Sequence, residues 1–358
     1  MSVQITTFDK KSIMYDYIVV GLGVAGFSFI QQLEENRQNF VVFDNNSQQS
    51  TRIAGGMFNP VILKRFTPAW QAAEMLPYAL LQFQKAELKY GKKYIHYIDI
   101  YRKLTGVEEQ NNWTVASDKP VMRDFMREIS HEKIDGIEAP YGFGVLRGTG
   151  IVNMSELLND VHQELSAQNK LIKENFDYNQ LHIHEEYIEY KNIKARKIVF
   201  AEGFGLKNNP FFNHLPLMGT KGEMLMIETD AKIPHIVKSN VFIAPNVAQK
   251  GQYYVGATYH WEDKTNIPTP EARKHLEEKL QQLLYKPYKV VLQKAGIRPT
   301  VIDRRPLTGT HKKYKNVGIL NGMGTRGVIL APTSAKKLFQ HMEFEMPLPK
   351  EMNINRFD

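Results

Sequence analysis

The chain has 358 residues, of which 42% are hydrophobic and 23% are charged, and this composition excludes a disordered or fibrous protein. Lysines and arginines number 46 against 38 aspartates and glutamates, which leaves a net charge of +8. Because no run of like charges concentrates that excess, it permits a nucleic-acid partner without indicating one. The sequence contains no cysteine, which excludes disulfides, thiolate metal sites and a thioether link to a cofactor.

No stretch of about 20 apolar residues predicts a transmembrane helix. Residues 1–15 are polar and lack the apolar core of a signal peptide, so the expected location is the cytoplasm. We expect residues 1–13 to form a loose tail, because Met14 directly precedes the first predicted strand and could itself be the start. Nothing in the sequence predicts the oligomeric state.

The first predicted structure is a βαβ unit. Residues 15–20 form a β-branched run that is typical of a strand buried on both faces. A glycine-rich turn follows at residues 21–26, then apolar residues at helical spacing as far as Leu33. A second strand at residues 40–43 ends on Asp44. The succession of strand, glycine turn, helix and strand fits within about 30 residues, as such a unit requires.

The glycine turn has the pattern of a dinucleotide-binding loop. Gly21 permits the tight turn, Gly23 lets backbone approach a pyrophosphate, and Gly26 lets the helix pack on the strand. Asp44, about 20 residues further on, can accept hydrogen bonds from ribose hydroxyls, and its charge disfavours NADP. The motif alone does not separate NAD from FAD, and a βαβ unit without a nucleotide is the structural alternative.

Further elements alternate along the chain. Helices are predicted at residues 70–90, 155–168, 271–284 and 332–341, the last with Pro332 in its first turn. Strands are predicted at residues 93–106, 113–115, 181–190, 197–201, 224–228, 241–244, 253–257, 289–296 and 317–320. His182 and His184 share one strand face but lack an evident third ligand, so no metal site is predicted.

Over nearly its full length the sequence resembles the D-amino-acid oxidase and glycine oxidase family of FAD-dependent oxidoreductases. Short motifs in the order of the family carry the resemblance: Thr51–Met57, Val199–Gly203, Lys221–Glu223, Val255–Thr258, Ala295–Pro299 followed by Asp303 and Pro306, and Gly322–Pro332. The resemblance implies FAD as a noncovalently held cofactor, and a small amine or amino acid as the substrate.

The resemblance also implies an α/β fold with two domains that are discontinuous in sequence. A Rossmann-like FAD-binding domain is expected from residues 14–66, 139–210 and 290–342. A second domain with a mixed sheet is expected from residues 67–138 and 211–289.

These motifs imply the residues that contact the cofactor. They are Gly21, Gly23, Gly26, Asp44, Thr51, Arg52, Gly55, Gly56, Met57, Ala201, Gly203, Gly296, Gly322, Gly324, Thr325, Arg326 and Gly327. A reduced flavin is anionic at its pyrimidine edge, and the backbone N–H groups of the final glycine loop and the following helix N-terminus would face it. Arg326 could add charge there, although a surface arginine is the simpler interpretation.

Arg298 matches the arginine that binds the substrate carboxylate in the family, and a planar guanidinium can pair with a carboxylate through two parallel hydrogen bonds. A structural ion pair with Asp303 is the alternative. Phe242 replaces a substrate-contacting tyrosine of glycine oxidase, and Thr325 replaces its second arginine, so both changes put glycine itself in doubt as the substrate. A cluster of aromatic residues could line the pocket or belong to the core: Tyr253, Tyr254, Tyr259, His260 and Trp261.

The chemistry that the resemblance implies is oxidation of a C–N bond, in which a hydride passes from carbon to the flavin and the imine hydrolyses. One alternative within the family is the oxidoreductase that removes a carboxymethyl group from a wobble-uridine side chain of tRNA, with which residues 56–60 and the net charge are compatible. A non-catalytic nucleotide-binding module is the alternative from a different class.

Overall fold

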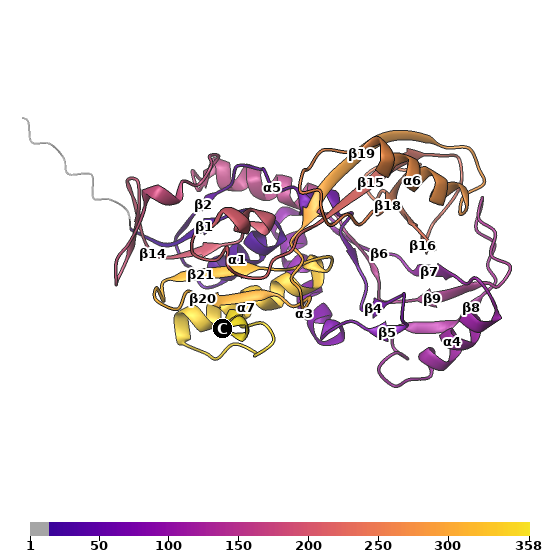
Figure 1. Cartoon of the computed structure of the whole chain (residues 1–358), viewed down its shortest axis with the longest axis horizontal. Coiled ribbons are helices and arrows are strands. Elements are labelled where there is room, and N and C mark those ends of the chain that lie inside the picture. Colours follow the sequence, from indigo (N-terminus) through magenta and orange to yellow (C-terminus); the bar gives the residue numbers. More distant parts are fainter. Residues whose placement is uncertain (1–13) are drawn as a thin grey trace, which may run out of the picture.

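The computed structural model describes residues 14–358, and the predicted tail at residues 1–13 lies outside them. Figure 1 shows two halves side by side, each built around an eight-stranded sheet. The first sheet contains β1 (Met14–Val20), β2 (Phe40–Phe43), β11 (Leu171–Ile172), β12 (Leu181–Ile183), β13 (Ile188–Tyr190), β14 (Ile193–Phe200), β20 (Leu307–Thr310) and β21 (Val317–Asn321). The second contains β7 (Ile100–Lys103), β8 (Met126–Ser130), β9 (Phe143–Leu146), β15 (Thr220–Glu228), β16 (Ile236–Lys238), β17 (Phe242–Pro245), β18 (Gln252–Gly256) and β19 (Lys289–Arg298).

Helices and short sheets complete the fold. The helices are α1 (Val24–Glu35), α2 (Ser50–Ile53), α3 (Ala72–Tyr90), α4 (Val107–Ser117), α5 (Met154–Ala167), α6 (Pro270–Gln281) and α7 (Gly327–Phe344), with 3-10 turns η1 (Tyr178–Gln180), η2 (Gly203–Asn208) and η3 (Ile354–Phe357). Two short sheets are separate from these: one pairs β3 (Met57–Phe58) with β10 (Gly150–Val152) and β10 with β6 (Ile95–Tyr97), and the other pairs β4 (Val61–Ile62) with β5 (Thr67–Pro68). The predicted α/β class with a second, mixed sheet is confirmed.

The first sheet has the strand order of a dinucleotide-binding fold. β1 pairs in parallel with β2 on one side and with β14 on the other, and β21 continues the parallel part beyond β14. Both faces of β1 are buried, as predicted from its β-branched run. Tyr17 and Val19 join a core shared with α1, α3, α5 and α7, whereas Ile18 and Val20 pack on the opposite face. The carboxyl ends of β1, β14 and β21 therefore meet at one edge of the sheet.

The second sheet takes in two segments that were expected in the FAD-binding domain. β9 pairs with β7 and β8, and β19 pairs along its whole length with β15. All four residues of β9 are buried, so the segment is a short apolar run whose partner strand nothing in the local sequence reveals. Residues 143–146 and 289–298 thus belong to the second sheet, although the predicted boundaries place almost all of them in the FAD-binding domain.

Two predicted elements were wrong in detail. Residues 113–115 belong to helix α4 and not to a strand, and the Trp113 ring packs against Phe66 with 5.2 Å between ring centroids. Helix α7 begins at Gly327, so Pro332 lies inside the helix and not in its first turn. The earlier start matters for function, because it places the helix N-terminus directly at the glycine loop.

Gly26 provides a test of this packing. A Cβ atom at position 26 would lie 2.0 Å from the carbonyl oxygen of Gly21, so Gly26→Ala should force α1 away from the end of β1. We expect the free energy of unfolding to fall by about 3 kcal/mol in chemical denaturation of the purified protein. Gly106→Ala is the control, because a Cβ at Gly106 meets no atom within 4 Å and its cost should stay below about 1 kcal/mol. Equal stability of the two variants would contradict the packing.

Candidate active site

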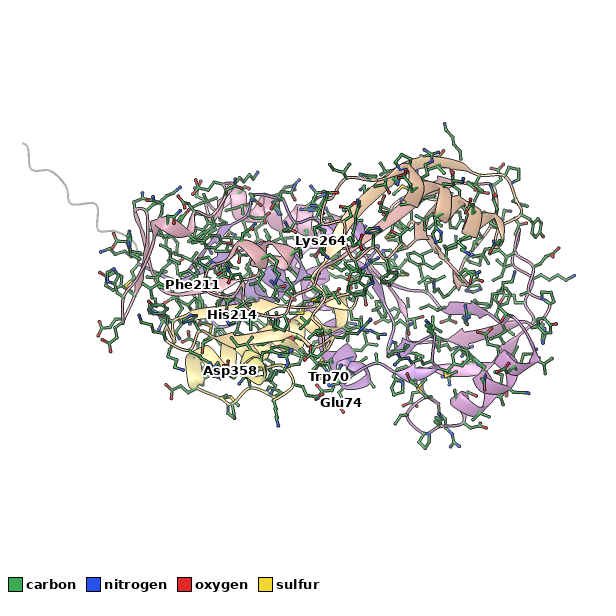
Figure 2. All side chains as sticks on the ribbon, in the orientation of Figure 1. Trp70, Glu74, Phe211, His214, Lys264 and Asp358 are labelled. Atoms are coloured by element: carbon green, nitrogen blue, oxygen red, sulfur yellow. The ribbon has the colours of Figure 1, made fainter. Side chains whose placement is uncertain are left out.

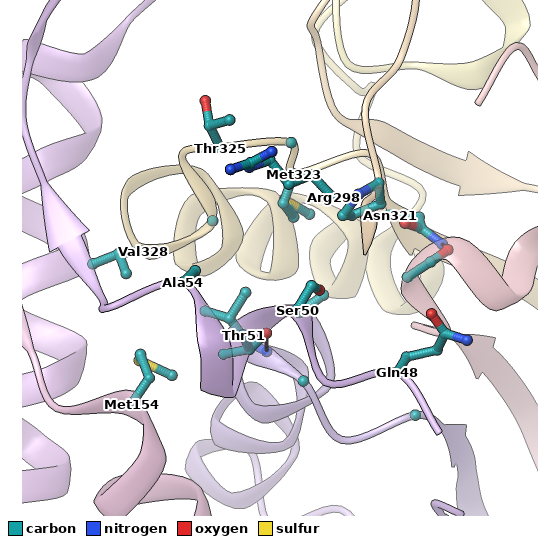
Figure 3. Close-up of a pocket in the computed structure, with 18 of the residues that line it drawn as sticks. Gln48, Ser50, Thr51, Ala54, Met154, Arg298, Asn321, Met323, Thr325 and Val328 are labelled. Atoms are coloured by element: carbon teal, nitrogen blue, oxygen red, sulfur yellow. Dashed lines mark hydrogen bonds between the residues drawn. The ribbon is translucent and has the colours of Figure 1, made fainter. Parts of the chain in front are cut away.

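A cavity of about 800 Å³ is lined both by residues at the carboxyl edge of the first sheet and by residues on one face of the second. That volume lies within the range of cofactor and ligand pockets. Figure 3 shows Arg298 and Met323 on one side of this cavity and Ser50 and Thr51 on the other. Most of the predicted residues come together here: Gly21, Gly23, Asp44, Thr51, Gly56, Met57, Ala201, Gly203, Phe242, Arg298, Gly324, Thr325, Arg326 and Gly327 all line the cavity.

The glycine turn after β1 brings the chain very close to the end of β14. Gly21 has φ +98°, and a Cβ there would lie 2.5 Å from the carbonyl oxygen of Ala201. The N–H of Leu22 donates to the Asp44 carboxylate at 3.1 Å, and the N–H of Val24 donates to Thr51 Oγ1 at 3.1 Å. Asp44 and Thr51 therefore hold the turn that opens helix α1.

Two helix N-termini meet at the cavity. A Cβ at Gly327, the first residue of α7, would lie 2.8 Å from Val24, the first residue of α1. Gly23, the N-cap residue of α1, has no side chain, and Arg326, the N-cap residue of α7, makes no capping hydrogen bond with its side chain. Both helices are long enough to carry a macrodipole, so their positive ends add at the same point of the cavity. The arrangement suits an anionic ligand such as a diphosphate.

Five predicted residues do not line the cavity. Arg52 turns away, and its guanidinium donates to Asn159 Oδ1 at 2.6 Å and to the Ser155 carbonyl at 3.3 Å on α5. A Cβ at Gly55 would lie 3.6 Å from the methyl group of Met224. Three of the five are glycines needed for packing. A Cβ at Gly26 would meet the Gly21 carbonyl, and one at Gly296 would meet Ile53 of α2. A Cβ at Gly322 would meet Val301 and Leu307.

Buried polar groups that the sequence did not single out also line the nucleotide half of the cavity. Glu202 accepts hydrogen bonds from Tyr178 and from Asn209, and burial raises its pKa to about 7. Asn321, at the end of β21, donates to the Gly203 carbonyl at 2.9 Å. Other lining residues of this half are Asn45, Gln48, Glu174, Asn175 and Phe176. They follow strand ends or lie in loops, where only the fold brings them together.

Arg298 lies flat on the second sheet. A Cβ at Gly222, on the neighbouring strand β15, would lie 2.1 Å from Arg298 Nη2, so the absence of a side chain there makes room for the guanidinium. Arg298 Nη1 donates to the Thr258 carbonyl at 3.2 Å, and the Tyr259 ring covers the guanidinium at 4.4 Å. Burial lowers the pKa of Arg298, and Tyr259 opposes that shift.

The alternative role for Arg298, an ion pair with Asp303, is wrong. Asp303 instead pairs with Arg356, whose Nε lies 2.7 Å from Asp303 Oδ2. Within residues 14–358, Arg298 forms no ion pair with a carboxylate, and its half-buried guanidinium faces the cavity. Partial burial of a charge without a partner is unfavourable, which favours an anionic ligand.

Arg326 is half-buried and lines the cavity, so the interpretation of a surface arginine is wrong. Its Nη1 donates to the Asn59 carbonyl at 3.1 Å. Burial lowers the pKa of Arg326, and Tyr259 opposes this shift as it does for Arg298. Thr325 is exposed at the rim of the cavity. The part of the cavity beside the second sheet, called the substrate half below, therefore has two arginines near one tyrosine ring.

Of the aromatic candidates, Tyr259 lines the cavity and the others do not. Tyr253 is buried and donates its hydroxyl to the Ala231 carbonyl. The loop that carries Tyr259 is anchored from beneath by the buried Lys221, which pairs with Asp263. Lys264, which lies at the junction of the two halves in Figure 2, donates to the carbonyls of Met218, Gly219 and Trp261.

No group of three or more His, Cys, Asp or Glu side chains that could hold a metal ion occurs between residues 14 and 358. No helix in that same stretch of chain is both long and apolar enough to cross a membrane.

Two glycine oxidases are similar to this chain over most of its length. A glycine oxidase of Pseudomonas aeruginosa is 23% identical over 359 residues, which cover 92% of this chain and 95% of that protein. A glycine oxidase of Bacillus licheniformis is 24% identical over 355 residues, with 90% and 92% covered. The tRNA 5-methylaminomethyl-2-thiouridine biosynthesis bifunctional protein of Idiomarina loihiensis is 23% identical over 177 residues, and this match spans 46% of the chain but only 29% of that protein.

Solved structures share the fold over almost the whole chain. Glycine oxidase from Geobacillus kaustophilus superposes with a TM-score of 0.77 at 17% identity, covering 93% of this chain and 96% of that one. Iminodiacetate oxidase from Chelativorans sp. BNC1 gives 0.73 at 14% identity, with 94% and 97% covered. The family model described as FAD dependent oxidoreductase matches residues 16–340, and the chain therefore belongs to this family of FAD-dependent oxidoreductases.

Proposed function

We propose that the protein oxidises the C–N bond of a small amine or amino acid, that FAD is held noncovalently, and that Arg298 binds a carboxylate of the substrate. Arg298 supports this most strongly, because its half-buried guanidinium faces the cavity of an FAD-dependent fold and pairs with no carboxylate of residues 14–358. We include a cytoplasmic location in the proposal.

The residues of the nucleotide half fit FAD. The positive ends of α1 and α7 would hold the diphosphate, with Gly21 and Gly23 allowing its close approach. Asp44 would accept hydrogen bonds from a ribose. Gly324 has φ +54°, and a Cβ there meets no atom within 4 Å, so this loop leaves room for a ring system near the α7 N-terminus.

When bound, FAD would supply the acceptor for the two electrons that leave with the hydride of the C–H bond beside the nitrogen. The protein orients the substrate: the two N–H donors of Arg298 fix the plane of the carboxylate and so the direction of the adjacent C–H bond. Met224 and Phe242 exclude water from the same wall of the cavity. The lining carboxylates Asp44, Glu174 and Glu202 all come from the nucleotide half, and oxidation of a neutral amine needs no side-chain base.

The tRNA alternative is not favoured. The tRNA-modifying protein matches over only 29% of its own length, whereas the two glycine oxidases match over 95% and 92% of theirs.

The cofactor assignment predicts a loss of FAD affinity when Asp44 is replaced. Asp44→Ala should weaken FAD binding by about 1–3 kcal/mol, because ribose hydroxyls and the Leu22 N–H lose their acceptor. Asp44→Asn keeps one acceptor oxygen and should lose less. Titration of apoprotein with FAD, followed by flavin fluorescence, gives the dissociation constants. An Asp44→Ala variant that binds FAD as tightly as the native protein would contradict the assignment.

Noncovalent attachment predicts that acid or heat denaturation releases all flavin into the supernatant. Because the sequence has no cysteine, a thioether link is impossible. Flavin colour that remains with the precipitated chain would reveal a link through another side chain and overturn this part of the proposal.

Removal of the guanidinium tests the substrate anchor. Arg298→Ala should lower kcat/KM for carboxylated amines by about 3 kcal/mol, more than a hundredfold, because the carboxylate loses a desolvated partner. Arg298→Lys keeps the charge but loses the second parallel donor, so it should retain part of the activity. Unchanged kcat/KM in Arg298→Ala, at unchanged FAD content, would leave Arg298 without a role in binding.

Gly222→Ala tests the position of the guanidinium without removing it. The new methyl group would overlap Arg298 Nη2 and lift the guanidinium off the sheet. We expect kcat/KM for carboxylated amines to fall by roughly tenfold or more, since small misplacements of a binding group are costly. Gly106→Ala again serves as the control. A Gly222→Ala enzyme with native kinetics would show that the resting position of Arg298 does not matter.

A further inference from the structure

A lysine that the sequence analysis did not select lies on the same wall of the cavity as Phe242. Lys238 of β16 is the cross-strand partner of Phe242 in β17, Phe242 is the partner of Gly256 in β18, and Gly256 is the partner of Met224 in β15. Directly paired residues point to the same face of a sheet. Met224, Phe242 and Lys238 all line the cavity, so Lys238 belongs to the same wall as the other two.

The charge of Lys238 is not balanced by the protein. Its neighbour in β7 is Arg102, which pairs with Glu109 at 2.6 Å. Glu109 is fully engaged, because its other oxygen accepts from the N–H and hydroxyl of Thr105. Within residues 14–358 no carboxylate pairs with Lys238, and burial together with Arg102 lowers its pKa to about 8.

Lys238 and Arg298 lie at different places along the wall. The Arg298 guanidinium lies over Gly222 of β15, and β16 is three strands away from β15 in the sheet order. Three strand spacings amount to about 14 Å between the strand axes, of which the lysine side chain spans a part. The two cations therefore lie too far apart to bind one carboxylate together, and Met224 and Phe242 form an apolar floor between them.

We propose that the substrate carries two anionic groups, and that Lys238 binds the one far from the carboxylate held by Arg298. The substrate class is then an amino or imino acid with a second carboxylate at the end of an extended chain. This inference rests on the proposed function. It assigns Lys238 a role in specificity: the lysine supplies the partner that a distant carboxylate needs on leaving water, while the apolar floor contacts the methylene groups in between.

A role for Lys238 as a general base is the competing explanation, because a lysine with a depressed pKa can accept a proton near neutral pH. The position of the lysine argues against this role. The amine of a substrate held by Arg298 lies one carbon away from the bound carboxylate, whereas Lys238 lies toward the other end of the wall. A base would also slow every substrate when removed, and a distal anchor would not.

The test uses the purified holoenzyme and a matched series of substrates. N-Carboxymethyl amines with one to four methylene groups before a terminal carboxylate are compared with their terminal primary amides, which have the same shape without the charge. A third series ends in a phosphonate and tests whether carboxylate or phosphate is the preferred anion. Anaerobic flavin reduction and steady-state kinetics give kcat/KM for native enzyme, Lys238→Met, Lys238→Gln and the control Lys289→Met, which removes an exposed lysine of β19.

We expect native enzyme to prefer the longer dicarboxylates over their amides by at least tenfold in kcat/KM, and Lys238→Met and Lys238→Gln to lower the dicarboxylates to the level of the amides. Lys289→Met should keep the native preference. Equal rates for carboxylates and amides in native enzyme, or an equal loss for both series in the Lys238 variants, would overturn the inference. Preference for the phosphonates would overturn the assignment to a second carboxylate.

A binding measurement without turnover separates this inference from the proposed function. Straight-chain dicarboxylic acids and monocarboxylic acids of equal length lack the amine, and their binding perturbs the visible spectrum of the oxidised flavin. Tighter binding of the dicarboxylic acids that disappears in Lys238→Met supports the second anion site even if no amine reduces the flavin. If amines reduce the flavin but dicarboxylic acids bind no better than monocarboxylic acids, the proposed function stands and the inference fails.

Discussion

The close contact between the ends of β1 and β14 determines where everything else in the site lies. At Gly21 the chain leaves β1 so close to the Ala201 carbonyl that any side chain would collide with it. This contact starts α1 at the edge of the sheet, beside the first residue of α7. Two positive helix ends and a tight backbone turn then face one cavity, which suits the negative charges of a dinucleotide. In the proposed arrangement the diphosphate of FAD is therefore held mainly by backbone groups.

The substrate half follows a different principle, because it uses side-chain charges that the protein leaves unpaired. Arg298 and Lys238 face the cavity from the second sheet, and the nearby acids are already engaged: Asp303 with Arg356, and Glu109 with Arg102. Glycines 222 and 256 keep the wall flat, so that the guanidinium and the Met224 and Phe242 side chains can lie over it. Unpaired positive charges on such a wall lower the stability of the free protein, and binding of an anion would remove this cost.

Much of the nucleotide half could be predicted from the sequence, because its signals are local. The spacing of Gly21, Gly23 and Gly26 after a β-branched run specifies a turn whose physics depends on a few neighbouring residues. The structure also brings the final glycine loop to the cavity as expected, although α7 begins at Gly327 and not at Pro332.

The substrate half was less predictable, because its features depend on pairing between distant strands. Lys238 gave no signal in the sequence; only the register of β16 with β17 and β7 shows that it shares a face with Phe242 and lies beside Arg102. The same holds for β9, a four-residue run whose local sequence does not reveal that it pairs with β7 as well as with β8, the strand that precedes it. Arg52 shows the reverse error, since its motif matched the family while its side chain reaches α5 instead of the cavity.

We propose that the FAD-dependent reaction of this protein acts on an amine whose carboxylate is bound by Arg298. The direct test of this role is anaerobic reduction of the bound flavin. The substrates are glycine, sarcosine, D-alanine, D-proline and longer dicarboxylic imino acids. Each is compared with the same amine lacking the carboxylate next to the amino carbon. We expect at least one carboxylated amine to bleach the flavin much faster than its decarboxylated counterpart does. Equal rates for each pair, or a flavin that no amine reduces, would contradict it.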